Sequence, residues 1–154
     1  MNQTRKVATK RVDIVSLKLV KESSVLYGKR FVHSPQDAAE IIKPFIADLD
    51  REQVIALCLD SKNQPTSVSK ISLGTLNQSM VHPREVFKTA VLSNAAGIII
   101  GHNHPSGDLT PSKDDLGGTE RLKNVGELLG IDLLDHVIVG PGKGYLSFRE
   151  QGLL

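Results

Sequence analysis

The stretch IIIGHNHPSGDLTPSKDD, residues 98–115, constrains the fold more than any other part of this 154-residue chain. An apolar run reaches a glycine and then two histidines that are separated by one residue. A Pro-Ser-Gly-Asp turn and an acidic cluster at a helix start follow. Side chains two residues apart in an extended chain point the same way, so His102 and His104 can present their imidazoles to one point. The pattern predicts a buried strand that ends in either a metal site or a polar turn.

Helix and strand patterns alternate along the chain and predict a single mixed α/β domain with helices flanking one central sheet. Strands are expected over residues 11–20, 53–60, 66–74, 97–101, 131–140 and 144–148, and helices over residues 34–50, 82–97 and 110–130. The first helix has Ser34 as its N-cap, Pro35 at its first position, and Pro44 as a cause of a kink or an early end. The third has Thr110 as its N-cap and Pro111 at its first position.

Apolar periodicity assigns inner faces to these elements. In the strand over residues 11–20, Val15, Leu17 and Leu19 share one face. The second helix should turn Val86, Ala90 and Val91 inward, and the third should turn Leu122, Val125 and Leu129 inward.

Composition excludes several classes of protein. Hydrophobic residues make up 40% and charged residues 23%, which is ordinary for a soluble globular protein, and the net charge of +2 is too small to indicate a nucleic-acid binder. The one cysteine, Cys58, lies in an apolar run, where a small core residue in a reducing compartment is expected. No apolar run approaches the ~20 residues of a membrane span, and no signal peptide is recognisable. We therefore expect a cytoplasmic protein without membrane contact.

A catalytic zinc site uses three protein ligands and keeps one position for water. The helix after the turn can supply the third ligand. Ser112 and Asp115 share one helical face, whereas Asp114 is rotated by about 100°. Asp115 is therefore the favoured ligand, with the Ser112 hydroxyl beside it. Asp108 is a rival because it follows His104 by only four residues.

The spacing His-x-His-x7-Ser-x-x-Asp resembles the motif of the JAMM (MPN+) zinc metallopeptidases. The segments VHPREVFKTAVLSNAAGIIIGHNHPSGDLTPSKDD and LLDHVIVG resemble the RadC family of bacterial JAMM-domain proteins. The resemblance covers residues 35–154 and leaves residues 1–34 as an N-terminal arm with the first strand. It implies an MPN fold with a curved sheet flanked by helices and zinc at the sheet edge. It further implies zinc ligands at His102, His104 and Asp115, and an oxyanion contact from Ser112.

JAMM enzymes also use a glutamate near the start of the first central strand as general base. Glu52, directly before the strand at residues 53–60, matches that position and is favoured; Glu85, at a helix start, is the alternative. The resemblance thus implies a metalloprotease-like hydrolase in which metal-activated water attacks an amide or isopeptide bond of a protein or peptide. Glu52 would take the proton of the water and deliver it to the leaving amine.

The remaining histidines are expected to be structural. His33 should lie in a surface turn, and His82 should make a polar contact at a helix start. His136 should be buried and hydrogen-bonded.

Two other readings stay open. RadC proteins commonly carry a helix-hairpin-helix-like region before this domain, and this chain resembles the short members without it. A DNA-associated accessory protein of DNA repair or a mobile element, with structural or vestigial zinc, would use the basic residues of the arm, Arg5, Lys6, Lys10 and Arg11. A partner-binding module would dock another protein, or a second copy as a homo-oligomer, at a sheet edge.

Overall fold

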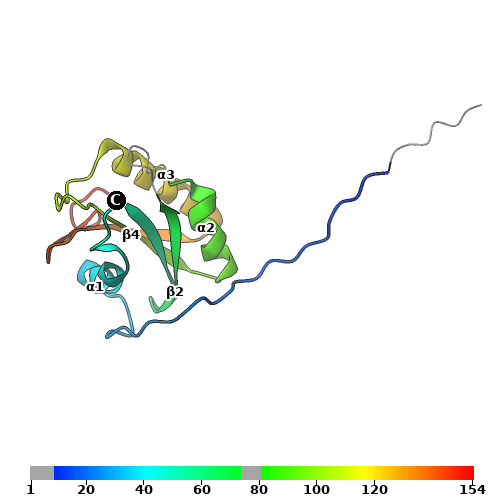
Figure 1. Cartoon of the computed structure of the whole chain (residues 1–154), viewed down its shortest axis with the longest axis horizontal. Helices are drawn as coiled ribbons and strands as arrows, with labels where there is room; N and C mark the ends of the chain where they lie inside the picture. The colour runs from blue at the N-terminus through cyan, green and yellow to red at the C-terminus, as the bar shows by residue number, and fades with distance from the viewer. Residues whose placement is uncertain (1–8, 74–80) are drawn as a thin grey trace, which may run out of the picture.

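The computed structural model describes residues 9–73 and 81–154, and within them it has three helices and five strands. Their order is α1 (Pro35–Ile46), β1 (Gln53–Leu59), β2 (Pro65–Leu73), α2 (Pro83–Leu92), β3 (Gly97–Asn103), α3 (Lys113–Leu129), β4 (Asp132–Val139) and β5 (Tyr145–Ser147). The strands form one sheet in the order β2-β1-β3-β4-β5, with α1 on one side and α2 and α3 on the other (Figure 1). The predicted mixed α/β class is confirmed.

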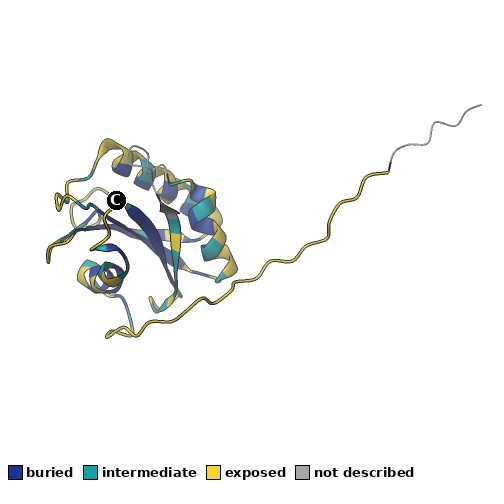
Figure 2. Ribbon diagram, viewed as in Figure 1, coloured by how far each residue is buried: buried dark blue, intermediate teal, exposed yellow. Residues whose placement is uncertain are grey.

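The sheet separates two hydrophobic cores. Every residue of β1 and β3 is buried (Figure 2), and their side chains alternate between the two faces. Ile55, Leu57 and Ile99 pack against α1, whereas Ala56, Cys58 and their neighbours pack against α2 and α3. The predicted strand with both faces covered is confirmed, and so is the buried position of Cys58.

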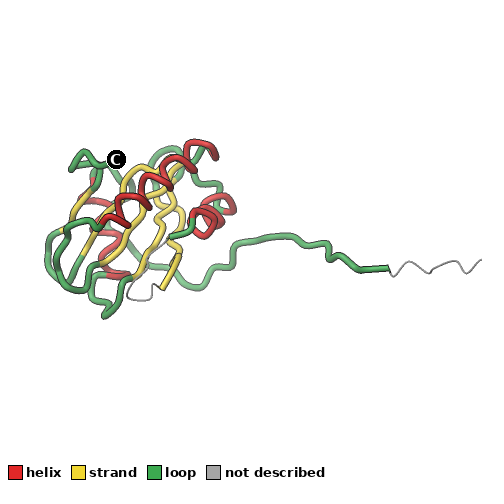
Figure 3. The backbone as a smooth tube through the Cα atoms, turned by 90° about the horizontal axis from the view of Figure 1, so that it is seen from above, coloured by secondary structure: helices red, strands yellow, loops and turns green. Residues whose placement is uncertain are grey.

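Strand register brings three chain segments to one end of the sheet. β1 runs antiparallel to β3, with Val54 opposite His102. β3 runs parallel to β4, with His102 opposite Ile138. The carboxyl end of β3 therefore lies between the amino end of β1 and the carboxyl end of β4. Figure 3 shows α3 crossing the sheet on one side.

Helix α1 begins as predicted, but α3 does not. Ser34 caps α1, and the helix ends two residues after Pro44. The expected cap at Thr110 is wrong, because Ser112 is the N-cap and Lys113 is the first helical residue. The backbone N–H of Thr110 instead bonds the Asp108 carboxylate at 3.0 Å, which keeps the chain in a turn for two more residues.

The strand expected over residues 11–20 is not formed. Residues 9–27 carry no helix or strand, and this stretch extends away from the domain with its side chains exposed (Figures 1 and 2). Ile14 and Leu17 are fully or largely solvent-exposed. Alternation describes which side chains a strand could bury, but a strand also needs a neighbouring backbone to bond. In the described part of the chain the arm has no such neighbour.

Two inward-facing assignments are also wrong. Val91 is 52% exposed and Leu129 is 48% exposed. Val91 and Leu129 come after the last buried residue of their helices, which is Ala90 in α2 and Gly126 in α3. The inner face of α2 also includes Phe87, which was not predicted. The assignments of Val86, Ala90 and Leu122 are confirmed. None of the described helices has the length and apolar surface that a membrane crossing requires.

Candidate metal centre

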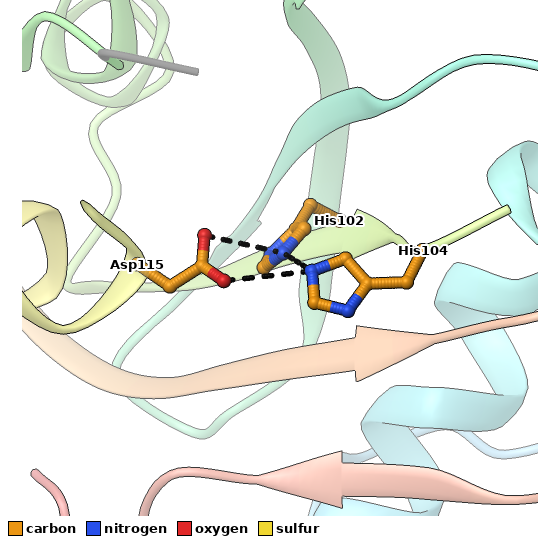
Figure 4. Close-up of side chains that lie close together, drawn as sticks. All are labelled: His102, His104 and Asp115. Carbon is orange, nitrogen blue, oxygen red and sulfur yellow. Dashed lines mark hydrogen bonds and ion pairs between the residues drawn. The ribbon is translucent and has the colours of Figure 1, made fainter. Parts of the chain in front are cut away.

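Two histidines and one aspartate converge at the carboxyl end of β3. One potential ligand atom from each of His102, His104 and Asp115 can be chosen so that all three lie within 4.8 Å of one another. The Nε2 atoms of His102 and His104 are each 3.4 Å from an oxygen of Asp115. Figure 4 shows both imidazoles turned toward this carboxylate. The predicted shared direction of the His-x-His pair and the return of the chain to Asp115 are thus both present.

The cluster is closed on one side and open on the other. The side chains of His102 and Asp115 are 2% and 6% exposed, whereas that of His104 is 12% exposed. A small hollow of about 20 Å³, lined in part by His102, Asp115 and Thr119, lies next to them. That volume is sufficient for about one water molecule.

The turn after His104 depends on backbone positions that a larger residue would disturb. The N–H of His104 donates to the carbonyl of Val139, which extends the pairing with β4 past the end of β3. Gly107 then adopts a φ of 82°, a conformation that side chains disfavour. A Cβ at Gly140 would lie 3.3 Å from the Gly107 Cα and from the His104 carbonyl oxygen. The backbone at Gly140 thus lies close to the backbone at His104 and Gly107, and this turn directs the chain back toward α3.

Asp115 is held in place by the start of α3. Its carboxylate accepts a hydrogen bond from the Ser112 N–H at 2.8 Å, and its own N–H donates to the Ser112 Oγ at 3.0 Å. This reciprocal capping box also places the carboxylate in the positive field of the helix N-terminus. Ser112 itself is exposed, and its hydroxyl proton is not consumed by the cap.

Asp108, the rival ligand, lies outside the group. Its carboxylate is exposed and accepts from Thr110. Its backbone carbonyl is the part that reaches the cluster, 2.6 Å from Nδ1 of His104. A carbonyl only accepts hydrogen bonds, so Nδ1 of His104 carries a proton. Nε2 of His104 faces His102 and Asp115, where it can bind a metal ion or a shared proton.

The cluster has the charge pattern of a cation site. The Nε2 atoms of His102 and His104 are 2.9 Å apart, and a carboxylate faces both. Three groups that accept protons or metals can share this space only around a positive charge, either a proton or a metal ion. Burial would raise the pKa of Asp115, but the two imidazoles hold it well below its usual range. Asp115 in turn raises the pKa of His104. Two imidazole nitrogens and one carboxylate oxygen are a donor set that suits zinc.

Glu52 is the nearby carboxylate of the two candidate bases. It directly precedes β1, is half-buried, and is one of the charges that raise the pKa of His104. Glu85 lies in the first turn of α2 and forms an ion pair with Lys88 at 2.8 Å. That ion pair lowers the pKa of Glu85.

Asn103 was missed by sequence reasoning although it lies between the two histidines. Because neighbouring residues of a strand face opposite sides, its amide points away from the cluster. The amide Oδ1 accepts from the Gln53 N–H at 2.7 Å, and Nδ2 donates to the Arg51 carbonyl at 3.1 Å. Asn103 therefore fixes the backbone on both sides of Glu52.

The other histidines occupy structural positions, as predicted. His82 caps α2, His33 is exposed, and His136 is buried and hydrogen-bonded. Burial lowers the pKa of His136 well below its ordinary value. Its partners are His102 and Thr119. Thr119 was not predicted, although it follows Asp115 by four residues and so shares its helical face.

Sequence comparison assigns the chain to a protein family. A family model described as RadC-like JAB domain matches residues 32–153. The chain belongs to this family. The RadC-like JAB family is related to the JAMM metalloproteases, and the sheet with three flanking helices is consistent with its JAB/MPN fold. The similarity to RadC proteins inferred from the motifs is confirmed.

The similar curated proteins are longer than this chain. A UPF0758 protein of Methanosarcina barkeri is 46% identical over 86% of this chain and 58% of its own length. One from Desulforamulus reducens is 48% identical over 80% of this chain and 54% of its own length. One from Clostridium botulinum is 44% identical over 95% and 65%. The chain thus spans between about half and two thirds of these relatives, and their names state no activity.

Proposed function

We propose that this domain is a zinc-dependent hydrolase that cleaves amide or isopeptide bonds of a protein or peptide. The observation that carries the proposal is the convergence of two Nε2 lone pairs and a buried carboxylate at a strand end with one open side. Three protein ligands with a remaining open position are the arrangement of catalytic rather than structural zinc sites. Membership of a family related to metalloproteases supports the reaction class.

Each residue of the proposed site has one task. His102, His104 and Asp115 would hold the metal. Bound zinc would supply a Lewis acid that lowers the pKa of water to about 7. The Glu52 carboxylate would accept a proton from the attacking water and then deliver it to the leaving amine. The Ser112 hydroxyl would donate a hydrogen bond to the oxyanion that develops on the substrate carbonyl.

The shape of the site favours a substrate that lies across the surface. The hollow beside His102 and Asp115 has room for about one water molecule. His104 is the most exposed of the three proposed ligands, so the scissile carbonyl would approach from its side. An extended peptide segment or a side-chain amide linkage on a protein surface has the required access.

Metal content is the first test. Elemental analysis of protein purified without a chelator or a metal-affinity tag should give about one zinc per chain. The zinc should be lost in His104→Ala and Asp115→Ala but kept in Glu52→Gln. Less than about 0.1 zinc per chain in the wild type, even after reconstitution, would contradict the proposal.

Hydrolysis is the second test. A peptide library prepared from a bacterial proteome would be incubated with zinc-loaded protein, and new amino termini and released lysine amines would be counted by mass spectrometry. Cleavage should disappear in Glu52→Gln and persist in the matched control Glu85→Gln. Equal cleavage by Glu52→Gln and wild type would remove Glu52 as the base. Absence of any cleavage by fully loaded wild type would argue against a peptidase.

A further inference from the structure

We propose that His136 and Thr119 are positioning residues that determine which nitrogen of His102 carries its proton and thereby direct the Nε2 lone pair of His102 toward the metal position. The inference rests on the metal site of the proposed function but not on any hydrolytic activity. It assigns a task to a buried histidine that holds neither metal nor substrate.

The direction of the hydrogen bonds follows from a single hydroxyl proton. The Oγ1 of Thr119 is 2.7 Å from the backbone carbonyl of Asp115, which can only accept. The hydroxyl proton is therefore donated to that carbonyl. The same Oγ1 is 2.6 Å from Nδ1 of His136, so it must accept there. Nδ1 of His136 carries a proton as a consequence.

The proton positions then pass from one ring to the next. His136 is 6% exposed, stacks on Phe148 and bonds no carboxylate among the described residues. A buried imidazole without a carboxylate partner is neutral and has one N–H. With that proton on Nδ1, the Nε2 of His136 is an acceptor. It lies 2.7 Å from Nδ1 of His102, which must donate. The Nε2 of His102 is left with a lone pair, 3.4 Å from the Asp115 carboxylate.

The hydrogen-bonded series returns to the residue from which it started. It runs from the Asp115 backbone through Thr119 and His136 to His102, and His102 then faces the Asp115 side chain. It joins α3, β4 and β3. The His136 ring is also stacked on Phe148, with centroids 4.5 Å apart and planes 16° from parallel. Its orientation is thus fixed by packing, and the two buried ligands cannot reorient independently.

The decisive measurement is the protonation of His102 in the metal-free wild type. Long-range 1H–15N NMR of the imidazoles distinguishes Nδ1–H from Nε2–H directly. The assignment would use His102→Gln to identify the resonances. We expect a proton on Nδ1 of His102 and on Nδ1 of His136, whether or not the proton shared by the cluster lies on Nε2 of His102. An Nδ1 of His102 that carries no proton would overturn the inference, and this test needs no variant of Thr119 or His136.

A matched pair of variants tests the consequence for metal binding. Thr119→Val removes the hydroxyl and keeps the shape, whereas Thr119→Ser keeps the hydroxyl. Competition of zinc against a chromophoric chelator should give a Kd about 10–100-fold weaker for Thr119→Val, in the range for groups that orient metal ligands. Thr119→Ser should stay within about threefold of wild type, and the NMR signals of Thr119→Val should show both tautomers of His102.

The outcomes separate this inference from the proposed function. Equal zinc affinity of the valine and serine variants, both folded, would overturn the inference. The expected NMR and affinity results with no peptide cleavage would leave it intact and contradict only the hydrolase. A purely structural role for Thr119 would lower the stability of the valine variant without moving the tautomer signals, and that result would also overturn it.

Discussion

Replacement of Gly126 by alanine should destabilise this domain, against the usual effect of that change inside a helix. Gly126 lies in α3, where the helix passes closest to the chain that enters β4. An alanine Cβ there would lie 2.5 Å from the backbone carbonyl oxygen of Ile131 and 3.4 Å from the Phe87 ring. A rotamer change cannot relieve the first contact because it involves backbone.

Two opposing effects set the magnitude. Alanine is favoured over glycine inside a helix by about 1 kcal/mol. Overpacking that shifts backbone in a close-packed core costs about 1–3 kcal/mol, and a contact at 2.5 Å against backbone belongs at the upper end. The net loss for Gly126→Ala should be about 1–2 kcal/mol. Gly117, in the same helix, has no atom within 4 Å of an added Cβ, so Gly117→Ala should gain up to about 1 kcal/mol.

Thermal and urea unfolding of the two variants and the wild type would measure the effect. For a chain of this size, 1 kcal/mol corresponds to about 2–4 °C in Tm. Gly126→Ala should therefore melt about 2–8 °C below wild type and Gly117→Ala at or above it. If Gly126→Ala were as stable as Gly117→Ala, the close packing of α3 on the start of β4 would be incorrect.

Three further predictions concern charge and hydrogen bonding. Asp37→Asn should lose about 1–2 kcal/mol at pH 7, because the carboxylate caps α1. The ion pair with Lys29 and the hydrogen bond from the His33 N–H lower the carboxyl pKa from 3.8 to about 2, so this stability is present above pH 4 and is lost as the pH falls through 2. Urea unfolding should show a clearly larger difference at pH 7 than at pH 2. Zinc affinity should fall at least about tenfold per pH unit below the raised pKa of His104, because a proton competes with zinc for His104 while Asp115 stays ionised. Competition titrations from pH 8 to 5 would measure this, and a zinc affinity that did not change with pH would contradict it. Asn103→Ala should cost about 1–3 kcal/mol by leaving buried backbone groups near Glu52 unpaired, yet it should keep one zinc per chain by elemental analysis.

Local patterns were sufficient for the parts of the fold that depend on near neighbours in the chain. The continuous apolar run of β1 and the Ser34 cap of α1 follow from residues within one element. The start of α3 did not follow, because Thr110 and Ser112 are both good caps in isolation. Only the Asp108 bond to Thr110 and the capping box of Ser112 with Asp115 decide between them. The strand predicted over residues 11–20 did not form for a related reason. Its apolar and polar residues alternate, but no described strand lies beside it to bond its backbone.

The sequence by itself predicted that His102, His104 and Asp115 come together, because the two histidines share a strand face and Asp115 opens the next helix after a tight turn. Periodicity and spacing within about fifteen residues are local properties that one chain segment carries. Only the tertiary structure decided which groups support that set. Asn103 reaches the backbone around Glu52, about a third of the chain away, and His136 reaches His102 from β4. These contacts depend on strand order and register, which are fixed by the packing of both cores rather than by any local pattern.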